Sequence, residues 1–285
     1  MKIIVMPRIF LMQGSALADT IRILKEFIVP RNEDLAINFS ELREINKSDL
    51  MVLIAQIEKS VLTNRNKIYR VGRFSSVKIL KDLLHKNTEV LHKYKEFPLP
   101  YLNDAEKQKL VDPLVIDSVV KDLKKIGIKE YYFPFNVILT ELIGNAVEHG
   151  IENRKISWWL THDVDRKAKC VKYTFVDMGS GIINSHKKAG LPFKYIFSGR
   201  KKIVIDAFLG KLGSSTKFVN RGRGLPQLRK MIEDEIISNF TVITNNVSLT
   251  IQNKKFSARS NPDFIGTYYS WTIDQNNYHK WKSIQ

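Results

Sequence analysis

A carboxylate and an amide stand one helical turn apart at Glu141 and Asn145, in the stretch Glu-Leu-Ile-Gly-Asn. At about 100° per residue, Glu141, Asn145 and Glu148 fall on one side of a helix. The opposite side is apolar, with Leu139, Leu142, Ile143, Ala146 and Val147. Such a carboxylate could take a proton from an attacking oxygen, and such an amide oxygen could hold Mg²⁺. Amphipathic helices are more often plain surface helices, so this pattern requires support from elsewhere in the chain.

Two pairs of glycines follow this helix in the sequence. Asp177-Met-Gly179-Ser-Gly181 comes directly after an apolar, strand-like run, and Gly222-Arg-Gly224 opens a later helix. An aspartate at a strand end can accept a hydrogen bond from the amino group of adenine, and glycines let a backbone approach a nucleotide closely. The first amides of a helix favour phosphate, so the second glycine pair predicts the phosphate end of a nucleotide site.

In this order and in these contexts, the motifs resemble those of the Bergerat-fold ATPases, the superfamily of DNA gyrase, histidine kinases and MutL. The resemblance covers residues 113–285. Glu141 and Asn145 match the N box of that superfamily, the two glycine pairs match its glycine boxes, and Gly266-Thr267 matches the pair that often opens its last strand. The resemblance implies ATP as ligand, Mg²⁺ held by Asn145, and Glu141 acting on the attacking oxygen. Further nucleotide contacts are then expected from Lys217, Arg221, Arg223 and Thr267.

Residues 182–221, between the glycine pairs, are the predicted ATP lid. They hold one acidic residue, Asp206, and nine basic residues, namely Lys187, Lys188, Lys194, Arg200, Lys201, Lys202, Lys211, Lys217 and Arg221. A basic segment with glycines spread through it can close over a triphosphate and reopen.

Residues 1–95 alternate strand-like runs with helix-like runs, which predicts a small α/β domain. Strands are expected over residues 2–5, 35–39 and 67–71, and helices over 17–28, 50–62 and 75–84. The layout around Asn46-Lys47-Ser48-Asp49-Leu50 resembles a STAS domain, the fold of anti-sigma-factor antagonists. That resemblance implies that Ser48 is a phosphoacceptor. The alternative is that Ser48 only caps a helix beginning at Asp49.

The chain is thus expected to join a STAS-like partner domain, residues 1–95, to an ATPase domain, residues 113–285. The segment 96–112 contains Pro98 and Pro100 and predicts a linker. The second domain is expected to be a Bergerat-type α/β sandwich, with helices on one face of a mixed sheet. The single cysteine, Cys170, excludes an intrachain disulfide framework and favours a cytoplasmic setting. No apolar run approaches the ~18 residues of a membrane helix.

The two resemblances together imply an ATP- and magnesium-binding regulatory protein of the anti-sigma serine kinase type. Its phosphoryl acceptor would be serine or water, and its partner a sigma-factor or STAS-type regulator, or a second copy of the chain. The net charge of +17 favours acidic partners, including nucleic acid. An ATP-gated, nucleic-acid-associated clamp or defence component is therefore the alternative, and an interaction module that binds nucleotide without chemistry is a third. Salt-dependent DNA retention would favour the clamp, and phosphoserine would favour the kinase.

Overall fold

The chain is a mixed α/β protein that divides into two compact units, Met1–Asn103 and Asp104–Gln285. The division falls inside the segment predicted as the linker. The computed structural model describes residues 1–30, 33–64, 67–71, 95–96, 121–149, 158–195, 197–212, 224–252 and 254–285. The predicted helix over residues 75–84 lies outside these ranges. None of the described helices is long and apolar enough to cross a membrane.

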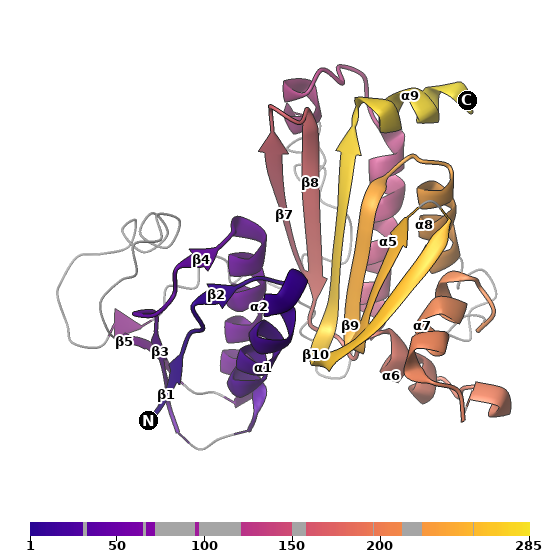
Figure 1. Ribbon diagram of the computed structural model, residues 1–285. Coiled ribbons are helices and arrows are strands. Elements are labelled where there is room, and N and C mark those ends of the chain that lie inside the picture. The colour runs from indigo at the N-terminus through magenta and orange to yellow at the C-terminus, as the bar shows by residue number, and fades with distance from the viewer. Residues whose placement is uncertain are drawn as a thin grey trace. The chain divides into compact units, whose positions relative to one another are not determined.

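The first unit carries a four-stranded sheet in the order β1-β3-β5-β6 (Figure 1). Its elements are β1 (Lys2–Val5), β2 (Ile9–Phe10), η1 (Gly14–Ala16), α1 (Leu17–Ile28), β3 (Leu35–Asn38), β4 (Glu44–Ile45), α2 (Lys47–Asn64), β5 (Ile68–Val71) and β6 (Lys95–Glu96). Strands β1, β3 and β5 are parallel, and β6 joins β5 antiparallel. The short strand β4, which the sequence did not predict, pairs with β2 in a separate two-stranded sheet.

Helix α2 begins one residue after Asn46, which caps it. The Oδ1 atom of Asn46 accepts a hydrogen bond from the backbone N–H of Asp49 at 2.8 Å. The interpretation of Ser48 as the N-cap is therefore wrong: Asn is as good a cap as Ser, and Asn46 holds the position just before the helix. Ser48 instead lies in the first turn and is only 1% exposed. Its role as a phosphoacceptor stays a prediction, and it requires the start of α2 to open.

We expect Ser48→Asp to destabilise the first unit. The positive end of a helix favours an anion by about 0.3–1 kcal/mol. Burying an uncompensated carboxylate costs several kcal/mol, and the neighbouring Asp49 is itself only 2% exposed, so the cost exceeds the gain. Ser48→Ala should cost about 1 kcal/mol, the usual value of a lost hydrogen bond. Thermal unfolding measures both variants, and an unchanged midpoint for Ser48→Asp would show that this helix start accepts a phosphate without opening.

The second unit is built on a sheet in the order β7-β8-β10-β9. Its elements are α5 (Phe133–His149), β7 (Trp158–Asp165), β8 (Cys170–Asp177), α6 (Ile182–Lys188), η3 (Phe193–Tyr195), α7 (Arg200–Phe208), α8 (Gly224–Glu233), β9 (Ser238–Gln252), β10 (Lys255–Asp274) and α9 (Gln275–Ser283). All pairings among these described strands are antiparallel, where the sequence predicted a mixed sheet. Two of the three pairings, β7–β8 and β9–β10, are hairpins, and hairpin strands are antiparallel.

Strands β9 and β10 form one long, bent hairpin. Strand β9 continues through Asn245, although this residue adopts a left-handed φ of 49°. The register with β10 shifts between Ser260 and Phe264 and again before Thr267. Such bulges bend a strand without ending it, and the bend of the hairpin is visible in Figure 1.

Helices α5, α7 and α8 gather on one face of this sheet (Figure 1). The apolar back of α5 is buried as its periodicity predicts, and Leu139 and Leu142 are fully enclosed. An aromatic layer lies beneath it: the ring of Phe135 is 4.9 Å from that of Tyr173 and 6.4 Å from that of Trp271. Burying such side chains contributes about 1.5–3 kcal/mol each, so this layer fixes α5 on the sheet.

Candidate functional site

Asp177 ends β8 and is 6% exposed. Its Oδ1 atom accepts a hydrogen bond from the backbone N–H of Gly179 at 2.9 Å. The hydroxyl and the backbone N–H of Thr267 also donate to this carboxylate. Burial raises the pKa of Asp177 to about 6, although these three hydrogen bonds act in the opposite direction. The group is therefore ionised at neutral pH and can accept a hydrogen bond from a buried donor.

The position of Thr267 depends on Gly266. Thr267 is the register partner of Asp177 across the β8–β10 pair. Gly266 has a φ of +98°, and a Cβ built on it would lie 2.0 Å from the carbonyl oxygen of Asp177. Only glycine allows β10 to approach the end of β8 this closely. The Gly266-Thr267 pair thus places a hydroxyl beside the buried carboxylate.

Two residues of β9 hold the loop that follows Asp177, and the sequence analysis missed both. Thr244 accepts a hydrogen bond from the backbone N–H of Ile182 at 2.8 Å, through its Oγ1 atom. Asn245 accepts from the N–H of Ile183 at 3.0 Å, and its Nδ2 atom donates to the carbonyl of Ser180 at 3.0 Å. The first amides of α6 are therefore satisfied from a strand that follows much later in the chain.

The Asn245 side chain also explains why residue 181 is a glycine. Gly181 has a φ of +78°, and a Cβ there would lie 2.7 Å from Oδ1 of Asn245. The glycine is required by its own backbone and by the Asn245 side chain, whether or not a ligand is bound. An Asn-Asn pair inside the segment that forms β9 was the available signal for this role, because asparagine is uncommon in strand interiors and tolerates left-handed φ.

The start of α8 lies against the two motif residues of α5. A Cβ on Gly224 would lie 2.4 Å from Oε2 of Glu141 and 3.6 Å from Nδ2 of Asn145. The structure therefore brings together the carboxylate, the amide and the second glycine motif. The Nδ2 atom of Asn145 is buried and has no hydrogen-bond partner in the part of the chain that the structure describes. Leaving such a group unpaired costs about 1–3 kcal/mol, which makes it a natural contact for a polar ligand.

Both clusters lie at the same end of the sheet. Helix α5 and strand β8 run in the same direction, starting from the contact between Phe135 and Tyr173 (Figure 1). Asn145 follows Phe135 by ten residues, which is about 15 Å along a helix. Asp177 follows Tyr173 by four residues, which is about 13 Å along a strand. The Asn145 amide and the Asp177 carboxylate thus reach the same level of the unit.

The prediction that residues 182–221 form a mobile lid is wrong for the part that the structure describes, residues 182–195 and 197–212. These form α6, η3 and α7, and their apolar side chains belong to the same core as the sheet. Ile183, Tyr195, Val204 and Phe208 are all at most 3% exposed. Their burial opposes any motion that lifts the segment away from the sheet. The many lysines of this segment made its buried apolar residues hard to recognise in the sequence, because lysines and apolar residues alternate within its short helices.

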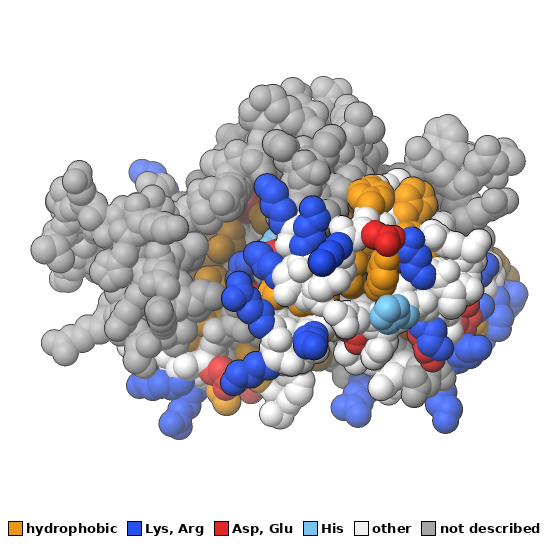
Figure 2. Space-filling view, turned by 90° about the horizontal axis from the view of Figure 1, so that it is seen from above, with side chains coloured by type: hydrophobic (Ala, Val, Ile, Leu, Met, Phe, Trp, Pro, Cys, Tyr) orange, Lys and Arg blue, Asp and Glu red, His pale blue; other side chains and the backbone are white. Residues whose placement is uncertain are grey.

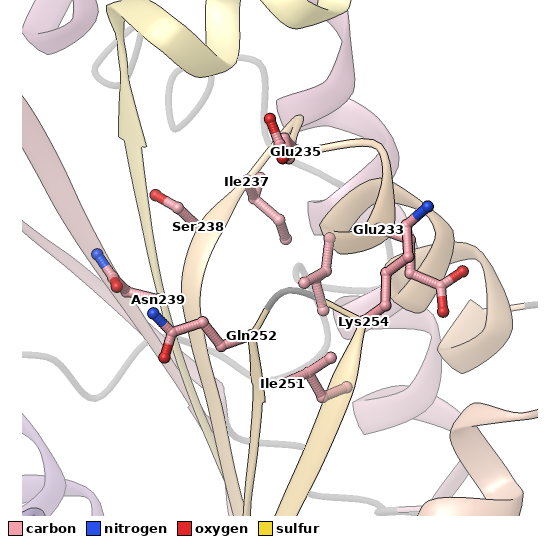
Figure 3. A pocket seen from close by; sticks show the side chains of 9 residues that line it. Glu233, Glu235, Ile237, Ser238, Asn239, Ile251, Gln252 and Lys254 are labelled. Atoms are coloured by element: carbon pink, nitrogen blue, oxygen red, sulfur yellow. The ribbon is translucent and has the colours of Figure 1, made fainter.

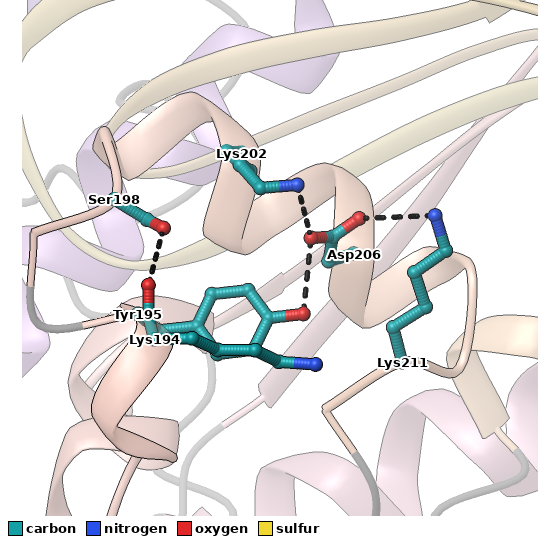
Figure 4. Close-up of polar contacts among 6 residues, drawn as sticks. All are labelled: Lys194, Tyr195, Ser198, Lys202, Asp206 and Lys211. Carbon is teal, nitrogen blue, oxygen red and sulfur yellow. Dashed lines mark hydrogen bonds and ion pairs between the residues drawn. The ribbon is translucent and has the colours of Figure 1, made fainter.

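Asp206 fixes this helical segment from inside (Figure 4). It is buried and accepts hydrogen bonds from the Tyr195 hydroxyl at 3.0 Å and from Lys202 at 2.9 Å. Lys211 lies 3.7 Å away. Burial alone would raise the pKa of Asp206, but these partners together hold that pKa below its usual value. Two of the nine predicted lid cations, Lys202 and Lys211, therefore pair with a structural carboxylate.

A pocket of about 310 Å³ lies at the opposite, C-terminal end of α8 (Figure 3). Two carboxylates line it, and both are already paired: Glu233 with Arg229 at 3.3 Å and Glu235 with Lys280 at 2.8 Å. The pocket therefore offers no unpaired carboxylate to a cationic ligand, and it does not contain the motif residues.

Four predicted contacts, Lys217, Arg221, Gly222 and Arg223, lie outside the described residues. Within the described ranges, no three His, Cys, Asp or Glu side chains gather as a metal site. The structure brings together Asp177, Gly179 and Thr267 at one cluster, and Glu141, Asn145 and Gly224 at the other. No protein-family model matches this chain, and no curated protein is significantly similar to it.

Proposed function

We propose that the second unit binds ATP with Mg²⁺ at the end of the sheet that carries Asp177, as the resemblance to Bergerat-fold ATPases implies. The observation that carries the proposal is the buried Asp177 carboxylate, which accepts hydrogen bonds from Gly179 and Thr267. It lies at the same end of the unit as the Asn145 amide and the start of α8. The exocyclic amino group of adenine is a donor that suits this carboxylate, and the first amides of α8 suit the phosphates.

The α5 residues have separate roles in this proposal. The amide oxygen of Asn145 would hold Mg²⁺, an ion that prefers oxygen ligands. When bound, Mg²⁺ neutralises charge on the phosphates. Glu141 lies beside the start of α8, where the γ-phosphate is expected, and its carboxylate takes the proton from the attacking hydroxyl or water.

The reaction is transfer of the γ-phosphoryl group from ATP to a serine hydroxyl or to water, leaving ADP. The parallel β1-β3-β5 sheet with α1 and α2 supports a STAS-like partner module on the same chain. We therefore favour a regulatory kinase or slow ATPase of the anti-sigma type, whose nucleotide state controls binding to a protein partner.

Incubation with γ-labelled ATP and Mg²⁺ tests the chemistry directly. Label on a serine of this chain or of an added STAS-type protein supports the kinase, and label in free phosphate supports the ATPase. ATP that binds but stays intact would indicate a nucleotide-gated binding module. Calorimetry that finds no ATP binding would contradict the proposal as a whole.

Asp177 gives the proposed site a pH dependence. Below its raised pKa of about 6 the carboxyl is protonated and no longer accepts from adenine. We therefore expect ATP affinity to fall by up to about tenfold for each pH unit below 6. Asp177→Asn should weaken binding near neutral pH and remove this part of the dependence. Calorimetric titration of both proteins across pH measures it, and any dependence left in the variant belongs to the phosphates of ATP.

The unbound protein supplies a second readout. The pKa of Asp177 is higher in the native state than in the unfolded state. At a pH between these two pKa values, the native state therefore binds more protons than the unfolded state. Stability should therefore fall as pH rises from about 4 to about 6, and stay lowered above 6. Asp177→Asn should flatten this decline in urea unfolding experiments. Identical pH profiles for the two proteins, in binding and in unfolding, would contradict the assignment of Asp177.

A further inference from the structure

Phe193 and Phe197 are the most exposed large apolar side chains among the described residues, at 77% and 84%. Phe193 begins the short η3 helix between α6 and α7, and Phe197 follows that helix. Their rings contact each other edge to face, with centroids 6.1 Å apart and planes at 79°. This geometry leaves ring faces open to solvent. Exposing two aromatic rings side by side is unfavourable in water, and such patches usually mark a binding surface.

Only positive charge surrounds this pair in the sequence. Residues 182–205 contain six lysines and arginines and no acidic residue. All six are exposed, namely Lys187, Lys188, Lys194, Arg200, Lys201 and Lys202. Among the described residues, Lys187, Lys194 and Lys201 form no ion pair with a carboxylate, in contrast to Lys202, which pairs with Asp206.

The charges at the start of α7 oppose the stability of that helix. Arg200, Lys201 and Lys202 fill its first turn, which contains no acidic residue, and Gly199 provides no side-chain cap. The positive end of a helix disfavours cations by about 0.3–1 kcal/mol each. A local arrangement that costs stability in the free chain is expected where a partner supplies the opposite charge. The partner is therefore anionic.

The aromatic pair distinguishes between two anionic partners. A membrane surface takes up a continuous apolar stripe, usually one face of an amphipathic helix. Here the two exposed rings belong to a segment in which Lys194 is exposed, Tyr195 is buried, and Ser198 and Gly199 follow the second ring. Pro192, beside the first ring, is also exposed, but the described residues form no continuous apolar stripe. Single-stranded nucleic acid alternates phosphates with flat bases, and each base can stack on one aromatic ring. The surface fits the nucleic acid better.

We propose that this surface, formed by Phe193 and Phe197 with Lys187, Lys194, Arg200 and Lys201, binds single-stranded nucleic acid. Bases stack on the two phenyl rings, and the cations contact the phosphates. Recognition of this kind depends little on sequence, because every base has an aromatic face. The inference is independent of ATP binding at Asp177.

Fluorescence anisotropy with a labelled oligothymidylate of about 15 nucleotides, the upper span of common stacking sites, tests the proposal. The full chain should bind the oligonucleotide, and affinity should fall as salt rises from about 50 to 200 mM. Phe193→Ala with Phe197→Ala should weaken binding about 10- to 100-fold and leave the salt dependence unchanged. Lys187→Gln, Lys194→Gln and Lys201→Gln together should reduce the slope of log affinity against log salt by about 2.

A second basic region supplies the matched control. The view in Figure 2 shows several exposed basic side chains. The β7–β8 turn holds three exposed cations, Arg166, Lys167 and Lys169. Changing these three to Gln removes the same net charge as the triple lysine variant. Because only the general charge of the protein changes, affinity for the oligonucleotide should stay within about twofold of that of the unchanged chain. All the substituted side chains are exposed, so the variants should fold.

Three results would overturn the proposal. The first is no binding of the oligonucleotide at low salt. The second is an equal loss of affinity in the triple lysine variant of the proposed surface and in the triple variant of the β7–β8 turn. That result would show that only the net charge of the protein matters. The third is a chain that binds phosphatidylserine vesicles but not the oligonucleotide, and that loses vesicle binding when the two phenylalanines are changed. That result would assign the surface to membranes.

Discussion

Glu141→Gln should lower the rate of ATP turnover by about 10²- to 10⁴-fold and leave ATP affinity nearly unchanged. Removing a general base typically costs that factor, because the proton of the attacking oxygen then has no acceptor. Glutamine keeps the shape of glutamate, which matters here because a Cβ on Gly224 would lie only 2.4 Å from Oε2 of Glu141. Phosphate release measures turnover, and calorimetry measures binding.

Two further variants separate the proton role from packing. Glu141→Ala also removes the contact with the start of α8, so it should lose turnover and some stability. Glu130→Gln changes an exposed glutamate that pairs with Lys282, and it should leave turnover unaffected. Turnover of Glu141→Gln within twofold of the unchanged chain would exclude the general-base role. Loss of ATP binding in Glu141→Gln would place Glu141 in binding instead.

The second large effect is expected at Gly266. Gly266→Ala should destabilise the second unit by more than about 4 kcal/mol, among the larger effects of single substitutions. The new Cβ would lie 2.0 Å from the Asp177 carbonyl oxygen, a backbone atom that cannot rotate away, and the φ of +98° adds strain. Thr267 would be displaced with β10, so ATP binding should weaken as well. Urea unfolding and calorimetry measure the two losses.

Gly190→Ala is the matched control for this effect. Gly190 also has a positive φ, +89°, but a Cβ there meets nothing within 4 Å. Its substitution should cost only the backbone strain, about 1–3 kcal/mol. The difference between the two variants then measures the close approach of β10 to β8. Equal losses of stability would mean that β10 can move away from Asp177 at little cost.

Features set by local sequence were predicted well. The 3.6-residue periodicity of α5 correctly placed Leu139, Leu142, Ile143 and Ala146 in the core. The first and third strands, β1 and β3, also lie where apolar runs predicted them, within one residue. Burial of an amphipathic face is decided within a few turns of chain, so its signal is present in a short window.

Features set by distant contacts were not predicted. Asn245 and Thr244 support the Asp177 loop from a strand more than sixty residues later, and no local pattern links them to it. The helical segment around Asp206 was misread as a lid because its lysines dominate the composition, whereas its stability comes from packing on the sheet. The roles of Glu141 and Asn145 in catalysis and magnesium binding stay predictions, although Gly224 brings them together with the second glycine motif.

The long β9–β10 hairpin has a consequence for the order in which the second unit folds. Its two strands are adjacent in the sequence, so their pairing closes a short loop and should form early. The β8–β10 pair, which joins Asp177 to Thr267, closes a loop that spans α6, α7, α8 and β9 and should form late. The carboxylate proposed to recognise adenine would then receive its threonine partner only near the end of folding. An intermediate that retains the hairpin would hold the hydroxyl of Thr267 but not the buried carboxylate beside it.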